Sequence, residues 1–186
     1  AMLLVFFLTS YFGIAAVGFF AFTSRIIKTP VSMVAGSVTQ VFFQDTSEKY
    51  ANGLPIQSMV VKMVRNLALW SAPAFAVLML FGPWLFALVF GEDWRQAGKY
   101  AQIMAPWMYI NFVVVPISQI PVVVHQQLSN FLISLFGHIL VIGAVIYGGY
   151  TGESIESTLT FISASQTIFL IVVIFWIIKI SGKVKE

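Results

Sequence analysis

The chain has 186 residues, of which 59% are hydrophobic and only 9% are charged, and its formal net charge is +3. Soluble domains carry about 25% charged residues, so the composition excludes a water-exposed globular surface and indicates an integral membrane protein. The absence of cysteine excludes disulfides, thiolate metal sites and cysteine nucleophiles. The cations fall mainly near the ends of apolar runs, which points to membrane topology and not to nucleic-acid binding.

Six apolar runs each approach the roughly 20 residues that a helix needs to cross the hydrocarbon core of a bilayer. The predicted fold is therefore an all-α membrane protein with six transmembrane helices. The predicted spans are residues 2–22, 26–44, 66–90, 100–124, 127–150 and 156–179.

The segments between these spans carry turn and breaker residues. Gly53 and Pro55 interrupt the polar stretch after the second span, and residues 57–65 are predicted to form a short amphipathic surface helix. Prolines lie in or at the ends of the third and fourth spans, where each can kink a helix. They are Pro73, Pro106, Pro116 and Pro121.

The distribution of lysine and arginine predicts the orientation. The C-terminal tail contains Lys179, Lys183 and Lys185, whereas the turn before the last span contains only acidic charges. The C-terminus is therefore predicted to be cytoplasmic. Trp84, Trp94 and Trp107 are then expected near the outer boundary of the bilayer, as part of an aromatic belt.

Two cations, Arg25 and Lys28, stand between the first two predicted spans, just before Pro30. The alternation of spans would place this turn outside, against the positive-inside rule. Cations at membrane depth cost about 2.5–3.5 kcal/mol on insertion scales and are usually functional. We therefore expect these two residues to have a role other than topology.

Polar residues recur every three or four positions along several spans, so they share helix faces. On the second span, which carries two cations, such a stripe is expected to line a water-filled cavity. On the fifth span a cavity wall and hydrogen bonding between helices both remain open, and a neutral His138 bonded to a neighbour is favoured over a titrating one. On the fourth and sixth spans, hydrogen bonding between helices is the favoured interpretation. The candidate cavity residues are Arg25, Lys28, Ser32, Gln40, Asn111, Gln119, Asn130, Ser134 and His138.

Motifs for catalysis and nucleotide binding are absent from the sequence. It contains no G-x-x-x-x-G-K-[ST] phosphate loop, no H-E-x-x-H zinc motif and no G-x-S-x-G nucleophile elbow. Its two histidines are far apart, which argues against a metal site. No Asp or Glu lies inside a predicted span, although a proton or sodium relay would require one there. We expect neither an enzyme nor a cofactor.

Two stretches resemble a known family. YFGIAAVGFFAFTSRIIKTPVSMVAGSVTQVFF, at residues 11–43, and FGPWLFALVFGEDWRQAGKYAQIMAPW, at residues 81–107, are similar to parts of bacterial polysaccharide and O-antigen flippases. These Wzx-like lipopolysaccharide biosynthesis proteins belong to the multidrug/oligosaccharidyl-lipid/polysaccharide exporter superfamily. The resemblance implies twelve or more helices in two lobes that rock around a central cavity. The chain looks like the C-terminal six-helix lobe, so an N-terminal lobe of the same protein is expected upstream.

The resemblance also implies a function. Undecaprenyl-pyrophosphate-linked oligosaccharide repeat units would be moved across the bacterial inner membrane by alternating access, for O-antigen or exopolysaccharide biosynthesis. The implied partners are this lipid-linked substrate, membrane lipids and, in the wider pathway, a polysaccharide polymerase or other assembly proteins. A multidrug or cation antiporter of the same superfamily and a non-transporting membrane scaffold in a polysaccharide assembly complex remain alternatives.

Overall fold

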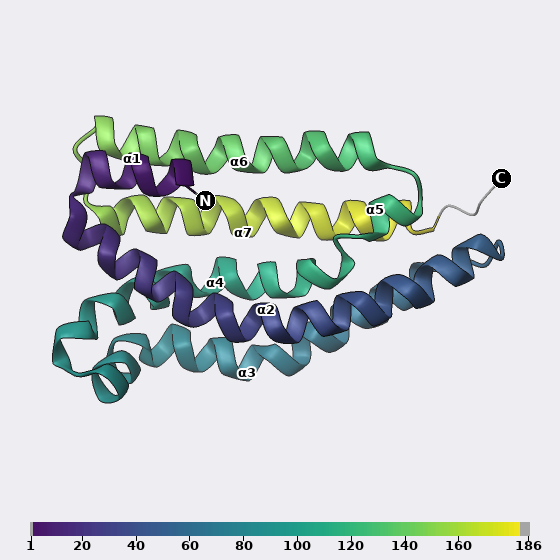
Figure 1. Ribbon diagram of the computed structural model, residues 1–186, viewed down its shortest axis with the longest axis horizontal. Helices are drawn as coiled ribbons and strands as arrows, with labels where there is room; N and C mark the ends of the chain where they lie inside the picture. The colour runs from purple at the N-terminus through teal and green to yellow at the C-terminus, as the bar shows by residue number, and fades with distance from the viewer. Residues whose placement is uncertain (1, 183–186) are drawn as a thin grey trace.

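The structure is a computed structural model that describes residues 2–182, with side chains from Phe6 onward, and every regular element in this range is helical (Figure 1). Five of the helical segments are long and apolar enough to cross a membrane, one fewer than predicted. The elements are α1 (Met2–Phe12), α2 (Ile14–Ala51), α3 (Gln57–Phe90), the 3-10 helix η1 (Glu92–Trp94), α4 (Arg95–Ile117), α5 (Ile120–Val123), α6 (Gln127–Tyr150) and α7 (Ile155–Ile180).

The first break in the chain lies at Gly13, ten residues before the predicted one. Gly13 has a φ of 82°, a conformation that glycine adopts far more readily than other residues. From Ile14 the helix α2 continues without interruption through Arg25, Lys28 and Pro30. The predicted turn between spans at 2–22 and 26–44 is therefore wrong. The predicted exception to the positive-inside rule concerned Arg25 and Lys28 in that turn. It no longer applies, because these cations lie within α2 and the residue between α1 and α2 is the uncharged Gly13.

Two further boundaries differ from the prediction. Residues 57–65 do not form a separate surface helix, because they are the first turns of the continuous helix α3. The predicted span at 100–124 is divided at Ser118 and Gln119 into α4 and the short α5. Pro121 contributes to this division because it has no backbone N–H to donate to the carbonyl of Ile117.

The other predicted turns are confirmed. Gly91 ends α3 ahead of η1, and the backbone turns again between α6 and α7. The start of α7 is fixed by Ser154, whose side-chain oxygen accepts a hydrogen bond from the backbone N–H of Ser157 at 3.1 Å. This is a conventional N-cap, which satisfies one donor of the first helical turn.

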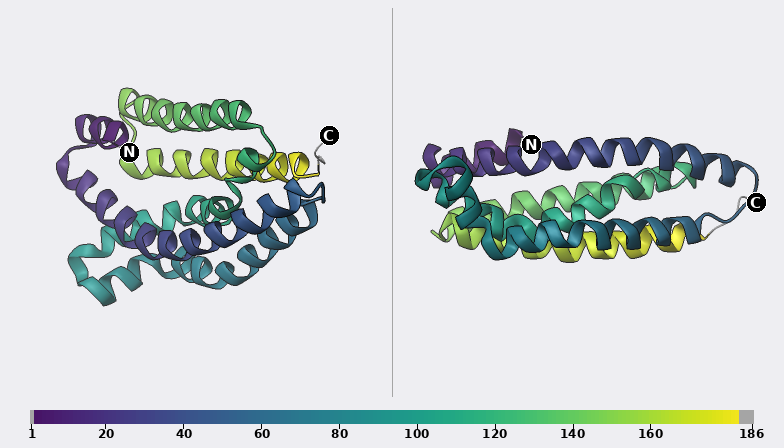
Figure 2. Two further views of the ribbon diagram at one scale, coloured as in Figure 1. Left: turned by 45° about the vertical axis from the view of Figure 1, so that its right-hand side comes forward. Right: turned by 90° about the horizontal axis from the view of Figure 1, so that it is seen from below.

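Helix α4 is the centre of the bundle. In the segment from Glu92 to Val123, which contains α4, half of the most apolar stretch is buried, against 17–28% in the other four spanning segments. It packs against α2, α3 and α7, while α6 packs on α7 and α1 packs on α6. Figure 2 shows α1 and α2 on one side of the molecule and α3 and α7 on the other, with α2 and α3 diverging from the turn that joins them. The diverging pair encloses α4.

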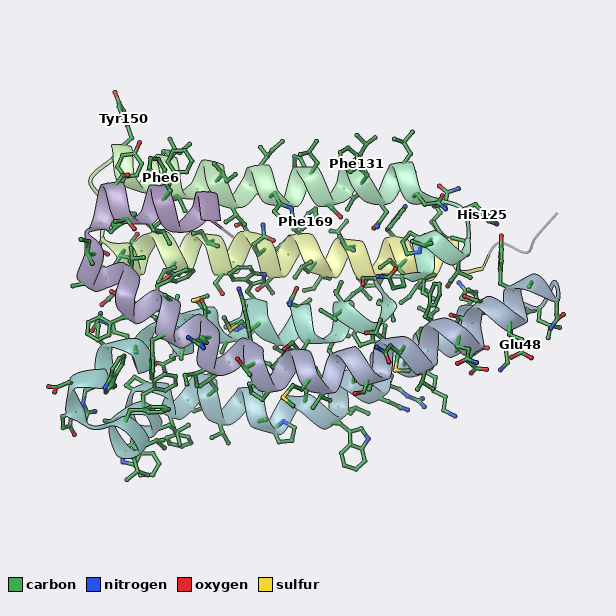
Figure 3. All side chains as sticks on the ribbon, in the orientation of Figure 1. Phe6, Glu48, His125, Phe131, Tyr150 and Phe169 are labelled. Carbon is green, nitrogen blue, oxygen red and sulfur yellow. The ribbon has the colours of Figure 1, made fainter. Side chains whose placement is uncertain are left out.

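Helices α2 and α3 are longer than a bilayer requires. Their 38 and 34 residues correspond to about 57 and 51 Å, against about 30 Å for the hydrocarbon core. The polar end of α2, from Gln44 to Lys49, makes up about 9 Å of the excess in α2. It reaches past the ends of α6 and α7, where Figure 3 labels Glu48.

Candidate functional site

A small cavity lies between α2 and α4, at about the middle of both helices. Its volume is about 120 Å³, and Lys28 and Asn111 are the polar residues on its wall. Ile27, Val31, Trp107 and Met108 complete the lining. Lys28 follows the first residue of α2 by 14 positions, which corresponds to about 21 Å of helix. The cation therefore lies deep within the span and not in an interfacial turn.

The Lys28 ammonium faces an aromatic ring. Its nitrogen lies 5.9 Å from the centre of the Trp107 ring, within the range of a cation–π interaction. The two ion pairs of the described residues join Arg95 to Glu92 and Lys99 to Glu156, so no described carboxylate neutralises Lys28. The prediction that Trp107 belongs to an interfacial aromatic belt is wrong, because this residue lies about 18 Å along α4 and beside the cation.

Contacts near the start of α2 and α4 hold the two helices in register. Thr23 is fully buried and donates its hydroxyl to the backbone carbonyl of Ala97 at 2.8 Å. One residue earlier, the ring of Phe22 lies 3.9 Å from that of Trp94. These contacts fix the side of α2 that faces α4. Lys28 lies on the flank of that side, next to buried Ile27, and is itself exposed.

The other predicted cavity residues of α2 lie outside this cavity. Arg25 is exposed, and its backbone carbonyl accepts the hydroxyl of Thr29. Ser32 is also exposed and donates its own hydroxyl to the carbonyl of Thr29 at 2.9 Å. Gln40 is exposed and lies 12 residues, or about 18 Å, beyond Lys28. The predicted stripe is present on α2, but only Lys28 of its members turns toward α4.

The polar residues of α6 form a second, separate group. Ser134 and His138 are exposed, and the His138 Nδ1 lies 2.7 Å from the carbonyl of Ser134 one turn earlier. His138 and Gly149 are 11 residues apart, so they share one side of the helix. Tyr11 of α1 packs against Gly149, so the polar stripe of α6 faces the layer formed by α1 and α2. Asn130 is half-buried on the same stripe.

The predicted residues of α4 divide between two places. Asn111 lines the cavity beside Lys28, whereas Gln119 is exposed at the break between α4 and α5. The sequence interpretation did not place Trp107 in the cavity, although it precedes Asn111 by four residues and hence shares its helix face.

Hydrogen bonds between helices come from side chains that the sequence interpretation did not select. On the fourth and sixth predicted spans, where bonds between helices were expected, Ser118, Thr160 and Thr167 instead donate their hydroxyls to carbonyls three or four residues earlier in the chain. Hydrogen bonds from a side-chain donor to a backbone carbonyl of another helix join Thr23 to Ala97, Gln57 to Ile178, Gln102 to Met79, Tyr109 to Ala68 and Gln166 to Gly137.

A comparison with known protein families shows which family the chain belongs to. The model of a family of polysaccharide biosynthesis proteins matches residues 2–99, which is more than half of the sequence and includes α1, α2 and α3. The chain belongs to this family. No curated protein and no solved structure matched it. The Lys28 side of the cavity in this polysaccharide biosynthesis protein lies within the matched region, and the Trp107 and Asn111 side lies just beyond it.

Proposed function

We propose that this chain is part of a transporter that moves lipid-linked oligosaccharides, carried on undecaprenyl pyrophosphate, across the bacterial inner membrane by alternating access. The family supports a role in polysaccharide biosynthesis, and the five apolar helices support a multi-pass membrane protein. The observation that carries the proposal is Lys28, a cation 14 residues into the long apolar helix α2 that faces the Trp107 ring and forms no ion pair with a described carboxylate.

The chemistry of the cavity suits the headgroup of such a substrate. The isoprenoid tail can remain in the bilayer, whereas the pyrophosphate and the sugars need a polar path. An ammonium group attracts phosphate oxygens through charge-assisted hydrogen bonds, and the amide of Asn111 can bond a sugar hydroxyl or a phosphate oxygen. Trp107 offers an apolar ring on the same wall. We assign Lys28 to charge recognition and Asn111 to hydrogen bonding.

The exposed polar residues extend this assignment. Arg25, Ser32 and Gln40 on α2, and Asn130, Ser134 and His138 on α6, belong in the proposal to the walls of a larger cavity that a second lobe would complete. Gln119 lies at the end of this path, at the break after α4. In this arrangement the 120 Å³ cavity is one recognition point on the path and not the whole path.

A cation antiporter would require an acidic residue within the spans. Among the described residues, the carboxylates lie in the last two turns of α2, in η1 and around the start of α7. The positive charge at Lys28 therefore favours an anionic cargo over a cationic one.

Replacement of the cations tests the proposal. Lys28→Ala and Arg25→Ala are expected to lower polymer export strongly while the protein still inserts and accumulates normally. Lys49→Ala, which removes a cation near the polar end of α2, is the matched control and should leave export unchanged. Normal export in both the Lys28 and the Arg25 variants would overturn the assignment of these residues.

A further inference from the structure

A second, larger cavity lies outside the polar site, between α6 and α7. This groove has a volume of about 600 Å³ and a lining that is almost entirely apolar. Ile133, Phe136 and Leu140 of α6 and Ile168, Val172 and Trp176 of α7 form most of its wall. Figure 3 shows Phe169, another lining residue, in the strip between the two helices.

The groove has the length of one leaflet. It follows α7 from Ser165 to Trp176, which corresponds to about 16 Å of helix. Half of the hydrocarbon core is about 15 Å. The hydroxyl of Ser165 donates to the carbonyl of Ile162, so it offers no free donor to a ligand in the groove. The lining therefore suits a hydrocarbon chain that ends within a single leaflet.

A cation stands at the end of this groove. Lys179 follows Trp176 by three residues and thus lies on the same stripe of α7, where it is exposed. Neither ion pair of the described residues involves it. The start of α6 adds polar groups at this end of the bundle, where Ser129 donates to the side-chain oxygen of Gln126.

We propose that this groove and Lys179 together bind one anionic phospholipid of the leaflet in which α7 ends. An acyl chain lies along the groove, and Lys179 pairs with the phosphate and the net negative headgroup. The single-leaflet length of the groove favours a phospholipid over a long isoprenoid chain. This site lies on a different side of α6 from His138 and Ser134, so it stands independently of the proposed transport path.

Native mass spectrometry of the full chain tests the proposal. The detergent-solubilised protein is incubated with either dioleoyl phosphatidylglycerol or dioleoyl phosphatidylcholine, which share the same acyl chains. The lipid that stays bound is measured after the detergent is removed in the mass spectrometer. We expect tighter binding of phosphatidylglycerol, by about fivefold, the factor that corresponds to about 1 kcal/mol for one cation near an anionic surface. Lys179→Gln should remove this preference, and Lys179→Arg should retain it.

Two further variants separate the groove from general surface charge. Ile168→Trp fills the groove and should lower the binding of both lipids. Lys62→Gln removes an exposed cation of α3, outside the groove, and should leave the preference intact. If Lys179 served only to stabilise the last turn of α7, its loss would change stability but not the lipid preference. Equal binding of the two lipids, or equal effects of Lys179→Gln and Lys62→Gln, would overturn the proposal.

Discussion

The ammonium nitrogen of Lys28 lies 5.9 Å from the centre of the Trp107 ring, across the contact between α2 and α4. A cation over an aromatic face gains about 0.5–1 kcal/mol at exposed sites and about 2 kcal/mol or more when desolvated. This gain offsets part of the cost of holding a lysine at membrane depth. A carboxylate would neutralise this charge, whereas the ring does not. In the proposed function the charge therefore stays available to the anionic cargo.

The role of the Trp107 ring leads to the first prediction. Trp107→Leu should lower polymer export, because it removes the aromatic face that positions Lys28. Trp107→Phe retains a ring and should preserve most of the export. Export is measured as surface polymer in cells that lack any other copy of the protein, with protein amounts matched by immunoblot. Equal export by the leucine and phenylalanine variants would show that the ring has no positioning role.

Water access to the polar stripes is the second prediction. The chain has no cysteine, so single cysteines can be introduced without background. Cysteines at Arg25, Gln40 and Ser134 should react with a membrane-impermeant, polar maleimide, because these positions are assigned to a water-filled path. Leu80 on α3 is 69% exposed but lies on an apolar face, and a cysteine there should be protected by lipid. Protection of all three polar positions would contradict the path.

The third prediction concerns the close approach of α3 and α4. A Cβ atom added at Gly98 would lie 2.5 Å from the backbone oxygen of Gly82 and 2.7 Å from the Cα of Pro83. Because these are backbone atoms, Gly98→Ala should force the helices apart at a cost of about 1–3 kcal/mol. The melting temperature in detergent should fall.

Gly143 supplies the matched control for this test. No atom lies within 4 Å of a Cβ added there, in the middle of α6. Gly143→Ala should leave the melting temperature unchanged or raise it, since alanine is a better helix former than glycine. Equal effects at Gly98 and Gly143 would refute the tight packing of α3 on α4.

The buried amide of Gln166 gives the fourth prediction. It donates to the carbonyl of Gly137 at 3.0 Å and joins α7 to α6. Gln166→Leu should destabilise the protein by about 0.6 kcal/mol, the average for hydrogen bonds between membrane helices. Gln40→Leu, at an exposed position, serves as the control and should have a smaller effect on the melting temperature. A Gln166→Leu protein as stable as the parent would show that the bond contributes nothing.

Part of this architecture was predictable because it follows from local sequence. Breaks after residue 51, near Gly91 and before Ile155 coincide with glycine, proline or capping residues, whose effect on the backbone does not depend on distant contacts. The break at Gly13 was missed because the apolar run continues on both sides of it. The charges at Arg25 and Lys28 suggested a turn, but a helix with a packed partner can include them, and Pro30 is tolerated within α2.

The candidate site was predictable only in its residue types. Helical spacing correctly grouped the polar residues of α2 and of α6 into stripes. It did not show which member of each stripe faces a neighbour, because that depends on the rotation of the helix within the bundle. For α2 the rotation is set by the Thr23 to Ala97 hydrogen bond and the packing of Phe22 on Trp94, both of which join residues more than 70 positions apart.

The sequence by itself predicted a helical, membrane-embedded protein, since 59% hydrophobic residues with 9% charge exclude a water-exposed surface and the apolar runs are long enough for spanning helices. Only the tertiary structure decided that α4 is central, that Lys28 lies beside Trp107 and Asn111, and that a groove lies between α6 and α7. These features depend on which helix faces come together, and packing between distant segments sets that choice.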